Sequence, residues 1–249
     1  MAEHARRTAA AWPAVAWVAL GAVVPLLALA VGAAPGAVFQ ALPALGRSLA
    51  LSLGVAAGAV LLALPSAAWL ARGNGRWRTL FRAVLTVPLT FSGVVVGFLF
   101  IVLLGRAGAL PRVLPFTAGW AYGMVGLLLA YLYFEIPRAV LALEGALRTV
   151  DLAALDEAAA VLGAGRLERV RRVHWPLLRP ALVEVTGLAF SVSLGSYGVA
   201  LLLAHRFEIL PVAIYEQWAG LDHPEVAATF AVVLAATGGL ANLVLQGRR

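Results

Sequence analysis

The sequence of 249 residues contains no cysteine and no lysine. Without cysteine the chain has no disulfide framework, no thiolate metal site and no cysteine nucleophile. Without lysine it lacks the phosphate-binding loop that ends in Gly-Lys-Ser/Thr, so it is not itself a nucleotide-hydrolysing subunit of that class. Charge is also scarce, because charged residues make up 12% of the chain while soluble domains average about 25%. With 62% apolar residues, the composition is that of a protein in a lipid bilayer.

The sequence contains several long apolar runs without charged residues, which soluble proteins rarely have. A helix of about 20 apolar residues spans the hydrocarbon core. Five runs of this length carry no charge, and a sixth carries only Glu184, near one end. The runs lack the ten-residue alternation of an outer-membrane barrel, so the sequence predicts an all-α polytopic membrane protein. Its single transmembrane domain, 1–249, is expected to hold six helices at about 11–33, 47–71, 82–105, 117–140, 179–204 and 225–246.

The arginines are unevenly distributed over the loops. Six spans place both termini on one side, and fifteen of the nineteen arginines then lie on that side. The positive-inside rule therefore assigns both termini to the cytoplasm. A secretory signal would also begin with Arg6-Arg7, but the first apolar run is longer than a signal's 7–15-residue core, which favours a retained helix. Topology and anionic membrane lipid account for the positive balance, so nucleic acid is not expected as a partner.

The longest hydrophilic stretch is the inner loop 148–176. Asp151 can cap a helix whose apolar residues recur at spacings of three and four, which makes one apolar stripe. Gly163 is expected to end this helix in a sharp turn. A second short helix fits Arg166 to His174, and Pro176 is expected to close it.

Two interpretations of this loop compete. A solvated basic loop that only orients the protein would explain the arginines. It would not explain an amphipathic helix with the small-residue run Ala158-Ala159-Ala160, which in water lacks a partner to bury against. A docking element for another protein is the more economical interpretation.

The same loop carries a spaced motif. Residues 157–159 read Glu-Ala-Ala, Gly163 follows after three residues, and Val173-His174-Trp175-Pro176 follows after nine more. In this motif the chain closely resembles the permease subunits of binding-protein-dependent ABC importers. Their signature has Leu where this chain has Trp175, a change that preserves bulk and apolarity.

The resemblance implies a type I importer permease in a bacterial cytoplasmic membrane, with a coupling helix that inserts into a cleft on a separate ATPase subunit. ATP and Mg²⁺ would bind that ATPase, and this chain would bind no cofactor and hold no metal or catalytic residue. Further implied partners are a second permease subunit, identical or a sister chain, and an extracytoplasmic solute-binding protein. The residues expected to couple to the ATPase are those of the signature: Glu157, Ala158, Ala159, Gly163, Val173 and Pro176.

Polar residues within the predicted spans are candidates for lining a pathway. Glu135 precedes Arg138 by three residues, so a local ion pair is a sufficient structural explanation for it. Glu184 shares a helical face with later serines and would suit either the pathway or the inner interface. Four further residues would line the passage or only bond neighbouring helices: Ser191, Ser193, Ser196 and Tyr197. The chain shows no internal repeat, so a pathway would lie between two subunits.

The cargo is less well specified than the mechanism. From the third predicted helix onward the chain resembles the branch that imports polyamines, ferric iron, thiamine or sulfate, and the stretches that carry this resemblance are Pro88 to Gly97, Pro176 to Pro180, Phe190 to Gly198 and Leu210 to Tyr215. A polyamine such as spermidine or putrescine is the first expectation, by resemblance, and intramembrane acids would stabilise such a polycation. Polar residues near the fifth and sixth helices would contact a solute-binding protein or form an ordinary solvated loop: His205, Glu208, Glu216, Asp222, His223 and Glu225.

Two alternatives come from other functional classes. A secondary transporter or channel would transport without ATP. An intramembrane enzyme would use Ser196 as nucleophile with His205 or His223 as base. Small residues around a membrane serine are more often helix packing, which disfavours the enzyme.

Overall fold

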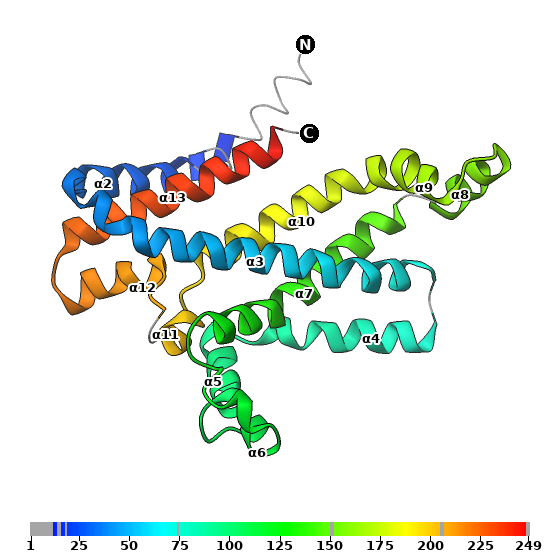
Figure 1. Ribbon diagram of the computed structural model, residues 1–249. Coiled ribbons are helices and arrows are strands. Elements are labelled where there is room, and N and C mark those ends of the chain that lie inside the picture. The colour runs from blue at the N-terminus through cyan, green and yellow to red at the C-terminus, as the bar shows by residue number, and fades with distance from the viewer. Residues whose placement is uncertain are drawn as a thin grey trace, which may run out of the picture.

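The computed structural model describes residues 12–13, 16–17, 19–73, 75–149, 152–204 and 207–247. Every regular element in these ranges is a helix. Four long helices run along the molecule (Figure 1): α3 (Val38–Ala71), α7 (Met124–Arg148), α10 (Trp175–Gly195) and α13 (Pro224–Gln246).

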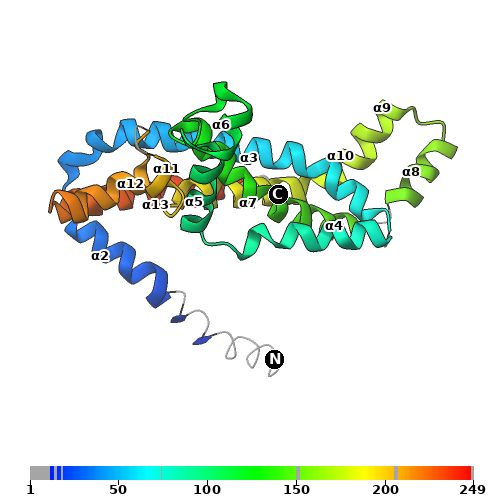
Figure 2. The same ribbon diagram turned by 90° about the horizontal axis from the view of Figure 1, so that it is seen from below.

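Shorter helices connect the long ones. They are α2 (Val24–Gly32), α4 (Arg76–Thr86), α5 (Gly93–Leu104), α6 (Ala109–Val113), α8 (Leu152–Val161), α9 (Arg166–Arg169), α11 (Ala200–Leu203) and α12 (Leu210–Tyr215). Single 3₁₀ turns lie at Pro35–Ala37, Pro88–Thr90 and Pro115–Thr117, and π-helical turns at Ala19–Val23, Val170–His174 and Glu216–Gly220. In Figures 1 and 2, α8 and α9 stand at one end, α2 and α12 lie toward the other, and α6 projects from the side.

The core forms where α3 packs against α7 and α10. One face of α3 is a ladder of buried alanines at spacings of three and four: Ala56, Ala59, Ala63 and Ala67. Larger side chains of α7 and α10, including Leu143 and Phe190, fill the space against them. Because lipid gives no hydrophobic drive between helices, small residues that allow close backbone approach favour this packing.

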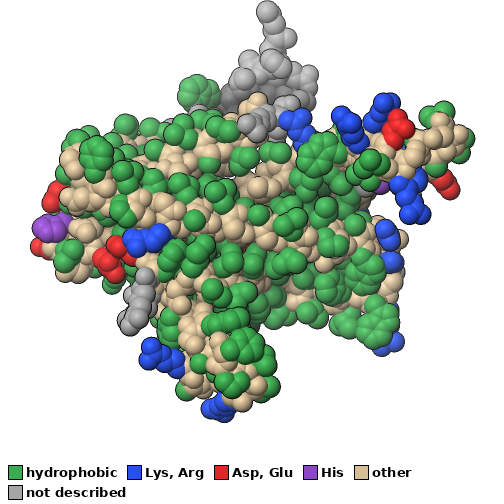
Figure 3. All heavy atoms as spheres, viewed as in Figure 1, with side chains coloured by type: hydrophobic (Ala, Val, Ile, Leu, Met, Phe, Trp, Pro, Cys, Tyr) green, Lys and Arg blue, Asp and Glu red, His purple; other side chains and the backbone are tan. Residues whose placement is uncertain are grey.

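Five helices in the described ranges are long and apolar enough to cross a membrane. They are Pro35–Ala71, Gly93–Val113, Met124–Arg148, Arg166–Gly195 and Pro224–Leu245. Figure 3 shows hydrophobic side chains over most of the visible surface, with several arginines gathered toward the end that carries α8 and α9. The prediction of an all-α membrane protein is confirmed at this level.

Several predicted boundaries differ from the structure. The predicted helix 225–246 matches α13, and the described part of 11–33 is helical from Ala19 to Gly32. The predicted helix 47–71 begins earlier than expected, because α3 begins at Val38 and continues through Pro43. The predicted helix 117–140 begins later, at Met124, because Gly119 and Gly123 adopt positive φ and turn the chain before it.

Two predicted helices are broken. The span 82–105 is interrupted at Val87–Ser92, where Pro88 opens a 3₁₀ turn and the Ser92 hydroxyl accepts from the Val95 N–H to start α5. The span 179–204 is interrupted after Gly195, and α11 begins at Ala200.

The predicted stop at Pro176 is also wrong. One helix runs from Arg166 to Gly195 through Pro176 and Pro180. A π-helical turn at Val170–His174, in which the Trp175 N–H donates to the Val170 carbonyl, precedes the proline. Proline in a helix lacks one donor, and its ring crowds the carbonyl four residues earlier. Because the π-helical turn has already shifted the hydrogen-bond ladder just before Pro176, the helix continues past this proline.

Candidate functional site

The inner segment folds as helix, glycine turn and helix, as the sequence predicts. At the end of α8 the Gly163 N–H donates to the Ala160 carbonyl and the Ala164 N–H to the Ala159 carbonyl, both at 3.0 Å. These two bonds are those of a Schellman motif with Gly163 at its left-handed position, where φ is 83°. A residue without Cβ adopts this φ at little cost, so the glycine determines where the chain reverses.

The apolar side of α8 is uncovered. This helix packs against α9 and the π-helical turn Val170–His174 at one end of the molecule (Figure 1). Val161 and Leu162 are each 86% exposed, and Glu157 is exposed nearby. Two neighbouring apolar side chains left this exposed beyond the long helices lack the stabilisation of burial, which is the pattern of a surface that meets a partner.

The remaining signature residues differ in exposure. Ala158 is exposed and Ala159 is half-buried on α8. Val173 is half-buried and Pro176 is exposed in the following helix. The predicted helix cap Asp151 lies outside the described residues.

An ion network around a buried carboxylate joins three helices just before α8. The Glu144 carboxylate is 4% exposed and accepts from Arg82 of α4 at 2.6 Å and from Arg148 at 2.8 Å. Arg148 also donates to the Leu70 carbonyl near the end of α3. The hydrogen bond to Glu144 raises the pKa of the Arg82 guanidinium above its ordinary value. Sequence reasoning missed this network, although Glu144 and Arg148 have the i, i+4 spacing of a helical ion pair.

The two acids predicted for the pathway have different surroundings. Glu135 is 1% exposed and pairs with Arg138, whose guanidinium lies 5.7 Å from the Phe134 ring centroid. This is the local ion pair expected from the three-residue separation of Glu135 and Arg138. Glu184 is exposed on α10.

The predicted hydroxyl residues separate into two groups. Ser191 accepts from the Asn242 side chain at 2.7 Å, and Ser193 is buried with its hydroxyl bonded to carbonyls of its own helix. Both therefore have structural partners. Ser196 and Tyr197 instead lie at the break after α10, where the Ser196 carbonyl accepts from the Tyr131 hydroxyl at 2.6 Å.

The two helix breaks touch each other. A Cβ placed on Gly93, at the start of α5, would lie 3.2 Å from the Val199 nitrogen, and one on Gly198 would lie 3.2 Å from the Val94 nitrogen. Only glycines allow backbones this close. One turn later, a Cβ on Gly97 would lie 2.9 Å from a Leu202 methyl. Sequence reasoning missed this contact because the two segments are about a hundred residues apart in the chain, and nothing local to either indicates the other.

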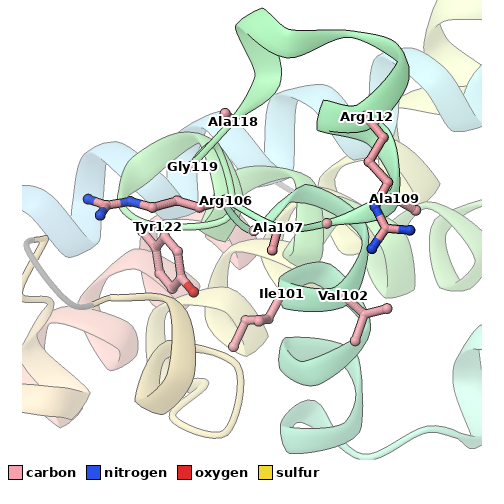
Figure 4. A pocket seen from close by; sticks show the side chains of 11 residues that line it. Ile101, Val102, Arg106, Ala107, Ala109, Arg112, Ala118, Gly119 and Tyr122 are labelled. Atoms are coloured by element: carbon pink, nitrogen blue, oxygen red, sulfur yellow. The ribbon is translucent and has the colours of Figure 1, made fainter.

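A cavity lies at the hairpin that follows α5. Its volume is ≈ 1180 Å³, and it is lined by α5, α6 and the turns around them. Figure 4 shows Arg106 and Arg112 on different sides of it, with Tyr122 on the side of Arg106. Its lining includes two arginines and no acidic residue.

The acidic and histidine side chains that flank α12 and begin α13 do not form a metal site. Within the described residues, no group of three His, Asp or Glu is arranged to hold an ion. Glu208 pairs with Arg47 at 3.2 Å, and His223 lies 3.7 Å from Glu225. Glu216 and Asp222 are exposed nearby, and His205 lies outside the described residues.

A family model described as the binding-protein-dependent transport system inner membrane component matches residues 59–246. The chain belongs to this family. The match covers the C-terminal part of α3 and every later element to the end of α13, including α8, the Gly163 turn and both helix breaks. The family resemblance read from the Glu-Ala-Ala motif is therefore confirmed, and the permease is a transport subunit.

The relatives of this permease are named for several different cargoes. The molybdenum transport system permease ModB of Mycobacterium tuberculosis is 34% identical over 72% of this chain and 69% of its own. The sulfate transport system permease CysT of Salmonella typhimurium is 30% identical over 68% and 63%. Ferric transport system permeases are also among the relatives. None of these names supports the expected polyamine cargo.

Solved structures share the fold of this permease. A bacterial ABC transporter for import of the polysaccharide alginate superposes with a TM-score of 0.72 over 97% of this chain and 93% of the other, at 16% identity. The likeness covers the described helices almost completely.

Proposed function

We propose that this permease is driven by a separate ATPase that docks on α8 from the cytoplasmic side. The observation that carries the proposal is the uncovered pair Val161 and Leu162, which lies where α8 ends, at one end of the bundle. Burying both side chains would contribute about 1.5–3 kcal/mol each. Glu157 on the same helix would meet a polar or basic group of the ATPase. The termini then lie on the same, cytoplasmic side.

The Glu144 network supports a path from α8 into the membrane. Its carboxylate links α4 and α7 through charge-assisted hydrogen bonds, and Arg148 is the last residue of α7 before the docking segment. A displacement of α8 would therefore be imposed on α7 and α4 together. ATP and Mg²⁺ act on the partner in this scheme, and this chain supplies the moving helices.

The translocation pathway would lie between this subunit and a second permease, identical or related. The paired helix breaks at Gly93 and Gly198 are the part of each subunit best suited to move, because broken helices change direction with few lost hydrogen bonds. Ser196 and Tyr197, which lie at the second break, would line the translocation pathway there. An extracytoplasmic binding protein would deliver the cargo to the opposite end from α8.

The cargo that fits best is an oxyanion of the molybdate or sulfate type. The cavity with Arg106 and Arg112 offers guanidinium groups suited to tetrahedral oxyanions and has no acid in its lining. Both buried acids, Glu135 and Glu144, are already paired with arginines and are poor sites for a polycation. The molybdenum and sulfate permeases among the relatives support the same choice.

The experiment is to purify the complete transporter and identify its subunits, then titrate its binding protein by calorimetry with molybdate, sulfate, ferric iron and spermidine. We expect tight binding of molybdate or sulfate. Tight binding of spermidine, with no response to either oxyanion, would refute the cargo and restore the polyamine. A ferric response alone would favour the iron branch of the family.

A further inference from the structure

The docking helix α8 is tied to the next helix by one carboxylate. Asp156 accepts from the Arg169 guanidinium at 2.8 Å through Oδ2 and contacts His174 Nε2 at 3.0 Å through Oδ1. These three residues, which we call the Asp156 clamp, bridge the Gly163 turn. Arg169 and His174 both belong to the long helix that continues into the membrane as α10.

The π-helical turn makes this double contact possible. Arg169 and His174 are five residues apart, and in an α-helix five residues rotate by about 500°, which leaves their side chains about 140° apart. In a π-helix the hydrogen bond runs from i to i+5, so residues five apart are neighbours one turn apart. The turn Val170–His174 is of this kind, with the Trp175 N–H bonded to the Val170 carbonyl. It therefore brings both partners to one face, toward α8.

The clamp is more shielded than the other ion pair of this segment. The side chain of Arg169 is 20% exposed and those of Asp156 and His174 are 35% and 33% exposed. Arg172 and Glu168 form an i, i+4 pair on the same helix at 77% and 45% exposure. Shielded charge-assisted hydrogen bonds are stronger than exposed pairs, so the clamp is the stronger of the two, and it is the one that joins α8 to the following helix.

We infer that Asp156 is the positioning residue that makes α8 and α10 move as one body, so that a displacement of α8 reaches the membrane-spanning part of α10. This inference rests on the proposed docking of an ATPase on α8 and adds how the motion leaves that helix. Without the clamp, the Gly163 turn would act as a hinge. The ATPase would still dock and hydrolyse ATP, but each hydrolysis would move cargo less often.

The test uses the complete transporter in proteoliposomes and measures cargo imported per ATP hydrolysed, together with the amount of ATPase retained on purification. We expect Asp156→Ala and Arg169→Ala to retain the ATPase and to lower the import-to-ATP ratio about fivefold. A fivefold change in the ratio of two conformations corresponds to about 1 kcal/mol. The reversed pair, Asp156→Arg with Arg169→Asp, should recover part of the ratio. The control Glu168→Gln breaks the exposed pair and should leave the ratio unchanged.

The outcomes separate this inference from the proposed function. A wild-type ratio in Asp156→Ala, or no recovery in the reversed pair, would overturn the clamp. Loss of the ATPase from Asp156→Ala would also overturn it, because Asp156 would then belong to the docked surface. Retention of the ATPase by the double variant Val161→Ser, Leu162→Ser would instead contradict the docking proposal itself.

Discussion

Replacement of Gly163 tests the geometry of the docking turn most sharply. The residue has φ of 83°, and a Cβ placed on it would meet no heavy atom within 4 Å. Steric overlap with neighbours is therefore absent, and the cost of Gly163→Ala is the left-handed conformation alone, about 1–2 kcal/mol. If the ATPase binds only the turned form, its dissociation constant should rise about 5–30-fold.

Gly165, two residues later, is a matched control. Its φ is −66°, which any residue adopts, and a Cβ there also meets nothing within 4 Å. The assay is titration of the purified ATPase subunit onto the permease in nanodiscs, followed by ATP-driven uptake. We expect wild-type affinity for Gly165→Ala, a small loss for Gly163→Asn because asparagine tolerates positive φ, and a large loss for Gly163→Ala. Equal affinities for the two alanine variants would refute the role of the turn.

Three further predictions concern the body of the permease. Glu144→Gln removes the buried carboxylate that holds Arg82 and Arg148, so the thermal midpoint in detergent should fall by about 5 °C or more, while Glu168→Gln on the exposed pair should barely change it. Gly97→Leu should overpack α5 against α11 and reduce uptake by the reconstituted transporter, with the ATPase still bound; unchanged uptake would count against a tight contact there. Replacing Arg106 and Arg112 together by Gln should lower oxyanion uptake about tenfold at limiting cargo, and equal uptake would remove this cavity from the path of the cargo.

What the sequence predicted well was local. The Gly163 turn follows from one residue type and its spacing, and α13 from one uninterrupted apolar run. Glu135 and Arg138 are three residues apart, so their pairing was also readable. The Glu-Ala-Ala spacing then identified the family.

What it missed depends on distant parts of the chain or on small backbone adjustments. Arg82 and Glu144 are 62 residues apart, and nothing local to either indicates the other. The break at Pro88 lies inside an apolar run, where hydropathy gives no signal. Pro176 was expected to end a helix, but a π-helical turn carries the helix past it. The same turn brings Arg169 and His174 to the side of the helix that faces Asp156. No pattern in the sequence indicated these contacts.

The most direct measurement of the central claim is oxyanion uptake into proteoliposomes that contain this permease, its ATPase and its binding protein. We predict uptake that requires ATP and that is abolished by Val161→Ser with Leu162→Ser, because the ATPase no longer docks on α8. Uptake that proceeds without ATP, or that persists at the wild-type rate in this variant, would contradict the account.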